Sequence, residues 1–398
     1  MRDLKHLIYF ESLLQEANNE LVKQACSEGK LALAYNCSYI PEPLLDIDGC
    51  FSVRLRAPGC VNPDLATYYM TNRSCPYSKS ILERAFEGGY NFISALVGQE
   101  CCTTMNRMEQ YFEYCKLIPN EKFFVCCIDM PTKKGEWYAG YFRRQIEKKI
   151  IAPMKEVYGV DFSDEKILDA IERHNELCRI ITEIGNFRKL DNPPITGYEF
   201  HVIQLVSEVC PKYLIIDKLR ETLEELKTRK PDENPPFRTR VMLAGSEIDD
   251  PEFTKLVEMC GALVVADRYC FGSLPGREQI VVNEGQDPLD ALAEHYMKIN
   301  ECPRTMGTES IISRKNYLYD VAKDYNAEGI ILQNMKFCEY WGYERAIAAK
   351  WLAEGLNVPT AIPTCQIERD YANAATGQLR TRFQAFVESL EIKRLQAE

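Results

Sequence analysis

The sequence predicts an α/β protein in which two small, doubly wound parallel-sheet domains face each other. A helical segment is expected between the domains, and a helix is expected at the N-terminus. Apolar stretches with the length of strands alternate with helical patterns both early and late in the chain. Between these regions the pattern is helical and polar, and it ends in a proline-rich linker at 231–236. The predicted divisions are residues 1–30, 31–137, 138–236 and 237–398.

The N-terminal 29 residues have the apolar spacing of an amphipathic helix, and Gly29 marks its expected end. The first sheet should follow directly. Pro76 predicts the start of a helix within this domain, since proline suits the first helical turn. The strands expected in the first sheet are residues 31–35, 51–55, 93–97 and 123–128.

The second sheet is expected after the linker. Acidic residues open the helix that follows its first strand, as the helix dipole favours. The strands expected here are residues 239–243, 262–266, 329–332 and 358–362, and the last helix is expected at 378–393.

Charge and hydropathy narrow the class of protein. A formal net charge of −11 argues against nucleic-acid binding, which normally requires a basic face. The N-terminus carries acidic residues inside its apolar run and lacks a small-residue cleavage site, so no signal peptide is expected. No apolar run approaches the roughly 18 residues that span a bilayer. We therefore expect a cytoplasmic protein that binds neither nucleic acid nor membrane.

Cysteine is unusually frequent, with 17 residues in the chain. A disulfide scaffold is not expected without a secretory signal, because cytosolic thiols stay reduced. No two cysteines are three positions apart, which excludes ferredoxin-type runs, zinc ribbons and thioredoxin-like dithiols. Any metal centre must therefore collect its ligands from distant parts of the chain.

Several cysteines stand at the ends of predicted strands. Cys102, Cys270 and Cys338 each follow a strand, and Cys75 stands at the start of a helix. Ligands of open α/β sheets bind beyond the carboxyl ends of the strands, and a helix N-terminus favours thiolate over thiol. Free cysteine also packs as a small buried hydrophobe. Spacing alone leaves a ligand role and a packing role equally open.

A series of short segments carries a family resemblance. In chain order they are 38–42 (SYIPE), 75–76 (CP), 89–92 (GYNF), 98–102 (GQECC), 267–273 (DRYCFGS), 302–303 (CP), 335–338 (MKFC), 370–371 (DY) and 377–388 (GQLRTRFQAFVE). Together they resemble the benzoyl-CoA reductase/2-hydroxyacyl-CoA dehydratase family of iron–sulfur proteins, over residues 30–390.

The resemblance implies a [4Fe–4S] cluster held by Cys75, Cys102 and Cys338, with Cys101 as the competitor of Cys102. The implied enzyme is a lyase that uses a low-potential electron for radical dehydration of a 2-hydroxyacyl-CoA, or a reductase of an acyl-CoA. Ser38 matches a position where relatives place a hydroxyl near substrate. An ordinary turn serine is the alternative reading of Ser38.

The resemblance also implies partners and two alternative functions. An ATP-dependent iron–sulfur activator and a second, identical or paralogous subunit are expected. The chain has neither a phosphate-binding P-loop nor a Gly-x-Gly-x-x-Gly motif, which agrees with ATP binding to the activator and not to this chain. The related double-cubane protein holds an [8Fe–9S] cluster with six cysteines and reduces small molecules. In this chain Cys270 and Cys302 would be ligands in addition to Cys75, Cys102 and Cys338. The sixth cysteine of that protein would correspond to a position near Gly89, where this chain has no cysteine. The other alternative is a non-catalytic electron-relay subunit.

Overall fold

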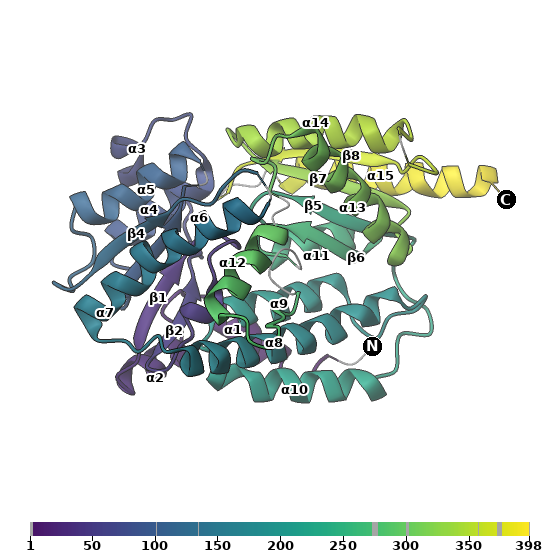
Figure 1. The fold of residues 1–398 in the computed structure, drawn as a ribbon. Coiled ribbons are helices and arrows are strands. Elements are labelled where there is room, and N and C mark those ends of the chain that lie inside the picture. The colour runs from purple at the N-terminus through teal and green to yellow at the C-terminus, as the bar shows by residue number, and fades with distance from the viewer. Residues whose placement is uncertain are drawn as a thin grey trace.

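The fold is a pair of parallel sheets, as the sequence predicts (Figure 1). The computed structural model describes residues 3–100, 102–133, 135–272, 278–299, 302–356, 358–371 and 376–397. The strand orders are β2-β1-β3-β4 in the first sheet and β6-β5-β7-β8 in the second, and every pairing is parallel. No helix among the described residues has the length and apolar character needed to cross a membrane.

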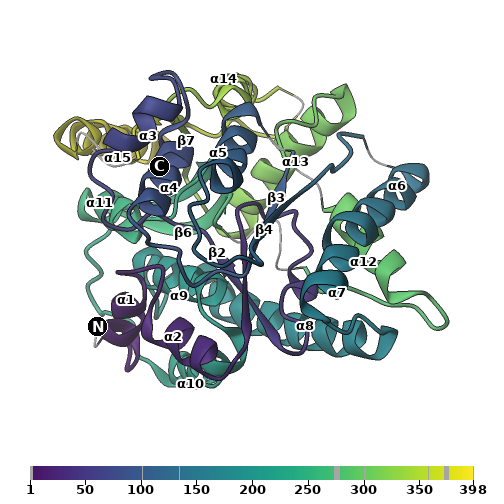
Figure 2. The same ribbon diagram turned by 90° about the vertical axis from the view of Figure 1, so that its left-hand side faces the viewer.

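The first sheet is covered on both faces, which explains its continuous apolar strands. Its strands are β1 (Leu31–Tyr35), β2 (Cys50–Arg54), β3 (Ala95–Gln99) and β4 (Phe124–Ile128). Figure 2 shows α4 and α5 on one side of this sheet and α6 and α7 on the other. The helices around it are α3 (Asp64–Tyr69), α4 (Pro76–Phe86), α5 (Thr103–Tyr114), α6 (Glu136–Ile146) and α7 (Ala152–Tyr158), with one π-turn, η2 (Glu147–Ile151).

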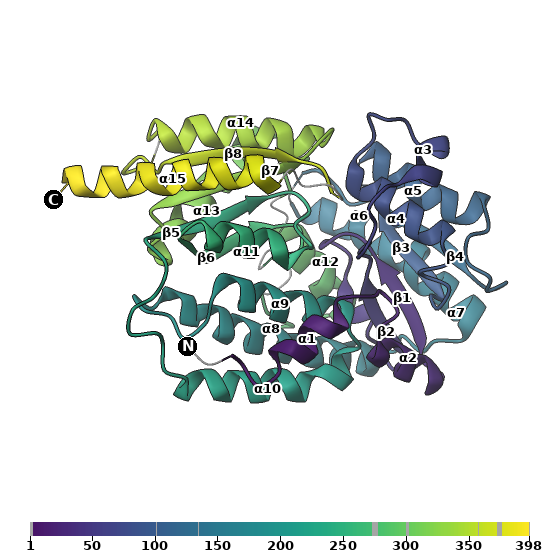
Figure 3. The same ribbon diagram turned by 180° about the vertical axis from the view of Figure 1, so that it is seen from behind.

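The second sheet is likewise enclosed, with α13 and α14 on one face and α11 and α15 on the other (Figure 3). Its strands are β5 (Thr239–Gly245), β6 (Ala262–Tyr269), β7 (Gly329–Met335) and β8 (Thr364–Arg369). The surrounding helices are α11 (Pro251–Met259), α13 (Thr308–Asp324), α14 (Glu339–Ala353) and α15 (Thr376–Ala397), while α12 (Pro288–Lys298) packs against α6 of the first domain.

The last predicted strand is wrong. Among residues 358–362 no strand forms, and the fourth strand of this sheet is β8, which begins at Thr364. Pro359 interrupts the apolar run, and proline cannot donate to a sheet ladder. β8 is an edge strand with Gln366 and Glu368 exposed, so its sequence lacks the apolar continuity of a central strand.

The single N-terminal helix is also wrong. Two helices form, α1 (Leu7–Leu13) and α2 (Glu20–Ser27). Asn19 starts the second helix, because its side-chain oxygen accepts the backbone N–H groups of Leu21 and Val22, both at 3.1 Å.

The central helical segment packs against both sheets. Its long helices are α8 (Asp164–Asn186), α9 (Gly197–Val209) and α10 (Lys212–Thr228), with short helical turns at η1 (Glu42–Leu44) and η3 (Phe187–Lys189) nearby. α9 is buried along nearly its whole length, and one hydrophobic cluster joins it to residues of both domains. A buried ion pair at 2.8 Å between Arg188 and Asp267 fastens this segment to β6.

Candidate active site

The carboxyl ends of the two sheets face each other, and polar contacts join them. The Ser38 hydroxyl, after β1, donates to the carbonyl oxygen of Cys270, after β6, at 2.6 Å. Arg56, after β2, donates to the carbonyl oxygen of Asp249, after β5, at 2.6 Å. The Tyr371 hydroxyl, after β8, accepts a hydrogen bond from the backbone N–H of Ala57, after β2, at 3.0 Å. The strand ends of both domains therefore enclose one shared site, where open α/β folds bind ligands.

Three helices begin at this site, and each has one of the predicted ligand cysteines at its N-cap position. These are Cys75 before α4, Cys102 before α5 and Cys338 before α14. A helix N-terminus favours thiolate over thiol. Two of these helices follow a central strand directly, which is the strand-end placement predicted from the sequence.

The structure brings the three thiols together although 263 positions separate Cys75 from Cys338. The Cys102 sulfur raises the pKa of Cys75, and the Cys75 and Cys102 sulfurs both raise the pKa of Cys338. Burial is the larger cause in both cases, and together these effects raise the pKa of Cys75 to about 12. Backbone N–H groups of Tyr77, Ser78 and Trp341 oppose the rise. The Cys75 and Cys338 thiols therefore keep their protons at neutral pH unless positive charge binds beside them.

These thiols have the chemistry expected of iron ligands. Three soft sulfur donors converge from two domains, and the N–H groups in the first turns of α4 and α14 can stabilise their anionic form. In the described part of the chain, no three His, Cys, Asp or Glu side chains are placed to hold one metal ion together. A cluster attaches each thiolate to a separate iron, so it accepts ligands that are too far apart for a single ion.

Cys270 and Cys302, the second-rank ligand candidates of the predicted cluster, form a neighbouring group with Cys37. Cys270 lies near both Cys302 and Cys37, whose sulfurs raise its pKa after burial and Glu247. Burial, followed by the Cys302 sulfur, raises the pKa of Cys37 to about 12. Cys37 comes directly after β1, so the strand-end criterion applied to the other cysteines would have found it. Cys101 lies outside the described residues.

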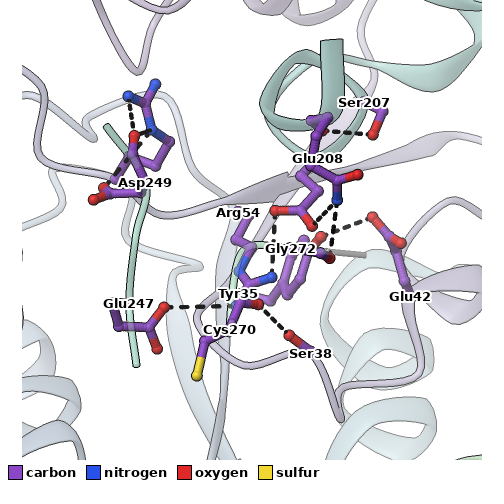
Figure 4. Close-up of polar contacts among 12 residues, drawn as sticks. Tyr35, Ser38, Glu42, Arg54, Ser207, Glu208, Glu247, Asp249, Cys270 and Gly272 are labelled. Atoms are coloured by element: carbon purple, nitrogen blue, oxygen red, sulfur yellow. Dashed lines mark hydrogen bonds and ion pairs between the residues drawn. The ribbon is translucent and has the colours of Figure 1, made fainter. Parts of the chain in front are cut away.

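A buried charge cluster lies beside Cys270 (Figure 4). The Arg54 guanidinium donates to Glu208 at 3.3 Å, lies 3.9 Å from the Glu247 carboxylate and stacks 3.8 Å from the Phe271 ring centroid. Burial raises the pKa of Glu247 to about 8, against the effect of Arg54. Glu247 in turn raises the pKa values of Cys75, Cys270 and Cys338, so its carboxyl lies close enough to act on cysteines of both groups.

Ser38 lines a small polar cavity of about 40 Å³ beside this cluster, together with Tyr35, Glu42, Arg54 and Glu208. Since one water needs about 10–15 Å³ by this measure, the cavity holds about three waters and no acyl chain. The Ser38 hydroxyl is already engaged by Cys270. The structure therefore gives Ser38 a structural contact between the domains.

Glu109 supports the first-domain side of the site and should impose a pH dependence on stability. Its buried carboxyl accepts a hydrogen bond from Asn36 at 2.5 Å, and burial raises its pKa from 4.5 to about 7. Between these pH values the folded protein holds a proton that the unfolded chain releases. The free energy of unfolding should therefore fall with rising pH, by roughly 1.4 kcal/mol per pH unit.

Denaturant unfolding of the metal-free chain between pH 4.5 and 7.5 measures this slope. Glu109→Gln should reduce the slope by about this amount, because glutamine does not titrate, while Glu247 and Glu258, whose pKa values are also raised, continue to contribute. Glu113→Gln on the same helix should leave the slope unchanged. An equal slope in wild type and Glu109→Gln would contradict the assignment.

The chain is similar to known proteins over most of its length. Residues 37–390 match the family model of the 2-hydroxyglutaryl-CoA dehydratase D-component. The chain is 24% identical to the (R)-phenyllactyl-CoA dehydratase beta subunit of Clostridium sporogenes, over 96% of this chain and 97% of that protein. It is 21% identical to the lactoyl-CoA dehydratase subunit beta of Anaerotignum propionicum, over 91% and 92% of the two chains. It is 22% identical to the (R)-2-hydroxyglutaryl-CoA dehydratase subunit beta of Acidaminococcus fermentans, over 92% and 93%.

The matched region contains every strand except β1, together with the central helices and Cys75, Cys102 and Cys338. With two facing parallel sheets and a match over almost its whole length, the chain belongs to the 2-hydroxyglutaryl-CoA dehydratase D-component family.

Proposed function

We propose that this chain is the iron–sulfur subunit of a 2-hydroxyacyl-CoA dehydratase, with a [4Fe–4S] cluster held by Cys75, Cys102 and Cys338. The observation that carries the proposal is the convergence of three thiols at helix N-cap positions between facing sheet ends. When bound, such a cluster supplies one low-potential electron to the site.

The protein's own residues would hold and tune the centre. Deprotonated Cys75, Cys102 and Cys338 supply three ligands, which leaves one iron position without a cysteine. The N–H groups facing Cys75 and Cys338 stabilise negative charge on sulfur. The Arg54 guanidinium, fixed between Glu208 and Glu247, keeps positive charge beside the ligand set without contributing a ligand. These groups would set the charge balance that determines the reduction potential.

The proposed partners follow from the relatives. Each of the three relatives described above is a beta subunit of a dehydratase. We therefore propose a complex with a paralogous subunit, in preference to a homodimer, and electron delivery by an ATP-dependent activator protein. An acyl-CoA thioester would be the substrate of the complex.

An electron-relay role is the second candidate. The cavity at Ser38, of about 40 Å³, is too small for an acyl group, which would then react on the paired subunit. A cavity of about 500 Å³ lined by Arg56, Asp249 and Tyr371 lies at the same strand ends, and its size favours the catalytic role. The grouping of Cys37, Cys270 and Cys302 favours a third candidate, a reductase with a double cubane. About eight irons per chain, where one [4Fe–4S] centre has about four, would identify that cluster.

A dehydration assay on the anaerobic complex tests the proposed function. The complex is purified through this chain from its source cells and mixed with activator, ATP and a reductant. Conversion of 2-hydroxyacyl-CoA thioesters into 2-enoyl-CoA is then followed by chromatography. Product that forms with wild type and with Cys115→Ala, but not with Cys338→Ala, is the expected result. Reduction of the acyl-CoA without loss of water would favour the reductase, and no conversion of either kind would contradict the proposal.

EPR of the reduced chain alone separates the catalytic and relay roles. Addition of a 2-hydroxyacyl-CoA should leave the signal unchanged if the substrate binds only to the paired subunit. A change in the signal would show that this chain places the substrate at its own cluster.

A further inference from the structure

A cavity of about 560 Å³ opens at the carboxyl end of the edge strand β8, on the second domain. Four cationic side chains line it, and only two carboxylates stand among them. The cations are Lys336, Arg345, Arg369 and Arg382, and the carboxylates are Glu368 and Asp370. The lining is thus cationic in a chain whose formal net charge is −11. Its volume is within the range of small-molecule sites.

Arg369 is the buried base of this cavity. Only 3% of the residue is exposed, and its Nε and Nη2 atoms have no hydrogen-bond partner in the structure. The guanidinium lies 4.7 Å from the Phe253 ring centroid. Burial lowers the pKa of Arg369 although Asp249 and Asp250 oppose the effect. A buried guanidinium with two open donor atoms is costly unless an acceptor reaches it.

The other cations surround the cavity at different depths. Arg345, in the second turn of α14, is half-buried, and its Nε atom also has no hydrogen-bond partner. Lys336 follows β7 and lies 3.5 Å from Asp370, and Arg382 on α15 donates to the Gln366 carbonyl oxygen at 3.4 Å. The first turn of α15 contains no acidic residue, so its positive dipole end is not offset there.

We propose that this cavity is a binding site for a phosphate group, with Arg369 and Arg345 as the principal donors and Arg382 and Lys336 at its edge. Arginine presents planar pairs of N–H donors that match phosphate oxygens, and a phosphate can accept from several donors at once. Neither aliphatic nor cationic ligands would satisfy the open guanidinium atoms.

Two sources of phosphate share this chemistry, inorganic phosphate and the phosphate groups of coenzyme A. The site lies close to the candidate centre in the sequence, because Lys336 is two residues before Cys338 and Arg345 is seven residues after it. Binding of coenzyme A there would rest on the proposed function, since it would place part of the thioester substrate on this chain. Binding of inorganic phosphate does not depend on that function.

Isothermal titration of the full-length chain with inorganic phosphate, coenzyme A and dephospho-coenzyme A tests the site. Arg345→Gln and Arg382→Gln should each weaken phosphate binding roughly tenfold, because each removes a charge-assisted donor. Arg380→Gln removes an exposed charge from the same turn of α15 without altering the lining, so it is the matched control. Unchanged thermal unfolding midpoints verify that the variants fold.

The outcomes are distinct. Weaker binding of both phosphate and coenzyme A in the two variants supports the site with coenzyme A as a ligand, and a preference over dephospho-coenzyme A identifies the 3′-phosphate as the group bound. Weaker binding of inorganic phosphate alone supports the site with free phosphate as its ligand. Affinities that are equal in wild type, Arg345→Gln and Arg382→Gln, or no binding of any of the three ligands, would overturn it. Phosphate binding that persists in Cys338→Ala shows that the site stands even if the iron centre does not.

Discussion

Anaerobically purified Cys338→Ala is expected to contain less than about one iron per chain, against about four in the wild type. Cys338 supplies the second domain's thiol to a set whose other members, Cys75 and Cys102, belong to the first. Without it, two thiols at one side of the site would have to hold the cluster, and too few ligands would remain to retain it. Cys75→Ala and Cys102→Ala should have the same effect.

Iron and labile sulfide determinations, with the visible absorbance of the cluster, measure this loss. Cys115→Ala is the matched control, because Cys115 is a partly buried cysteine at the C-terminal end of α5, the helix that Cys102 begins. It should retain the wild-type iron content. Full iron content in Cys338→Ala would exclude this residue as a ligand, and Cys270 and Cys302 would then be the next to replace.

Glu344→Gln is expected to lower the free energy of unfolding by about 3–5 kcal/mol, since it leaves buried cations without their counter-charge. The Glu344 carboxylate accepts from Arg314 through two bonds of 3.1 Å and also from the Lys315 ammonium. All three side chains are at most 4% exposed. The cluster fixes α13 against α14, the helix that begins at Cys338.

Denaturant unfolding of the wild type and the variant gives the change in stability. Glu339→Gln is the matched control, because Glu339 is an exposed residue in the first turn of the same helix. Its effect should stay within about 0.5 kcal/mol. A loss below about 1 kcal/mol in Glu344→Gln would contradict the interpretation of Glu344 as the essential counter-charge.

The sheets were predictable from the sequence because their strands are buried on both faces. Leu31–Tyr35 matches its prediction at both ends, and seven of the eight strands lie where apolar runs indicate them. The eighth strand, β8, has no continuous apolar run, because it lies at the edge of its sheet with polar residues facing outward, and the sequence therefore did not predict it. The break between α1 and α2 depends on a capping contact of Asn19 that apolar periodicity does not reveal.

The candidate site was predictable only in part. The strand-end criterion identified Cys102, Cys270 and Cys338. In the structure Cys75, Cys102 and Cys338 lie near enough for their sulfurs to affect one another's pKa values, and their role as cluster ligands stays a prediction. The cluster around Arg54 joins residues 154 positions apart, and no local pattern marks such a pairing. The sequence likewise does not predict the burial of Arg369 or its donor atoms without partners, because both depend on how β8 packs against α11 and α15.

The most direct test of the central claim is the iron and labile sulfide content of the unmodified chain after anaerobic purification. One [4Fe–4S] cluster on Cys75, Cys102 and Cys338 predicts a brown protein with about four irons and about four sulfides per chain. A colourless preparation without iron, from cells that supply iron and exclude oxygen, would contradict it.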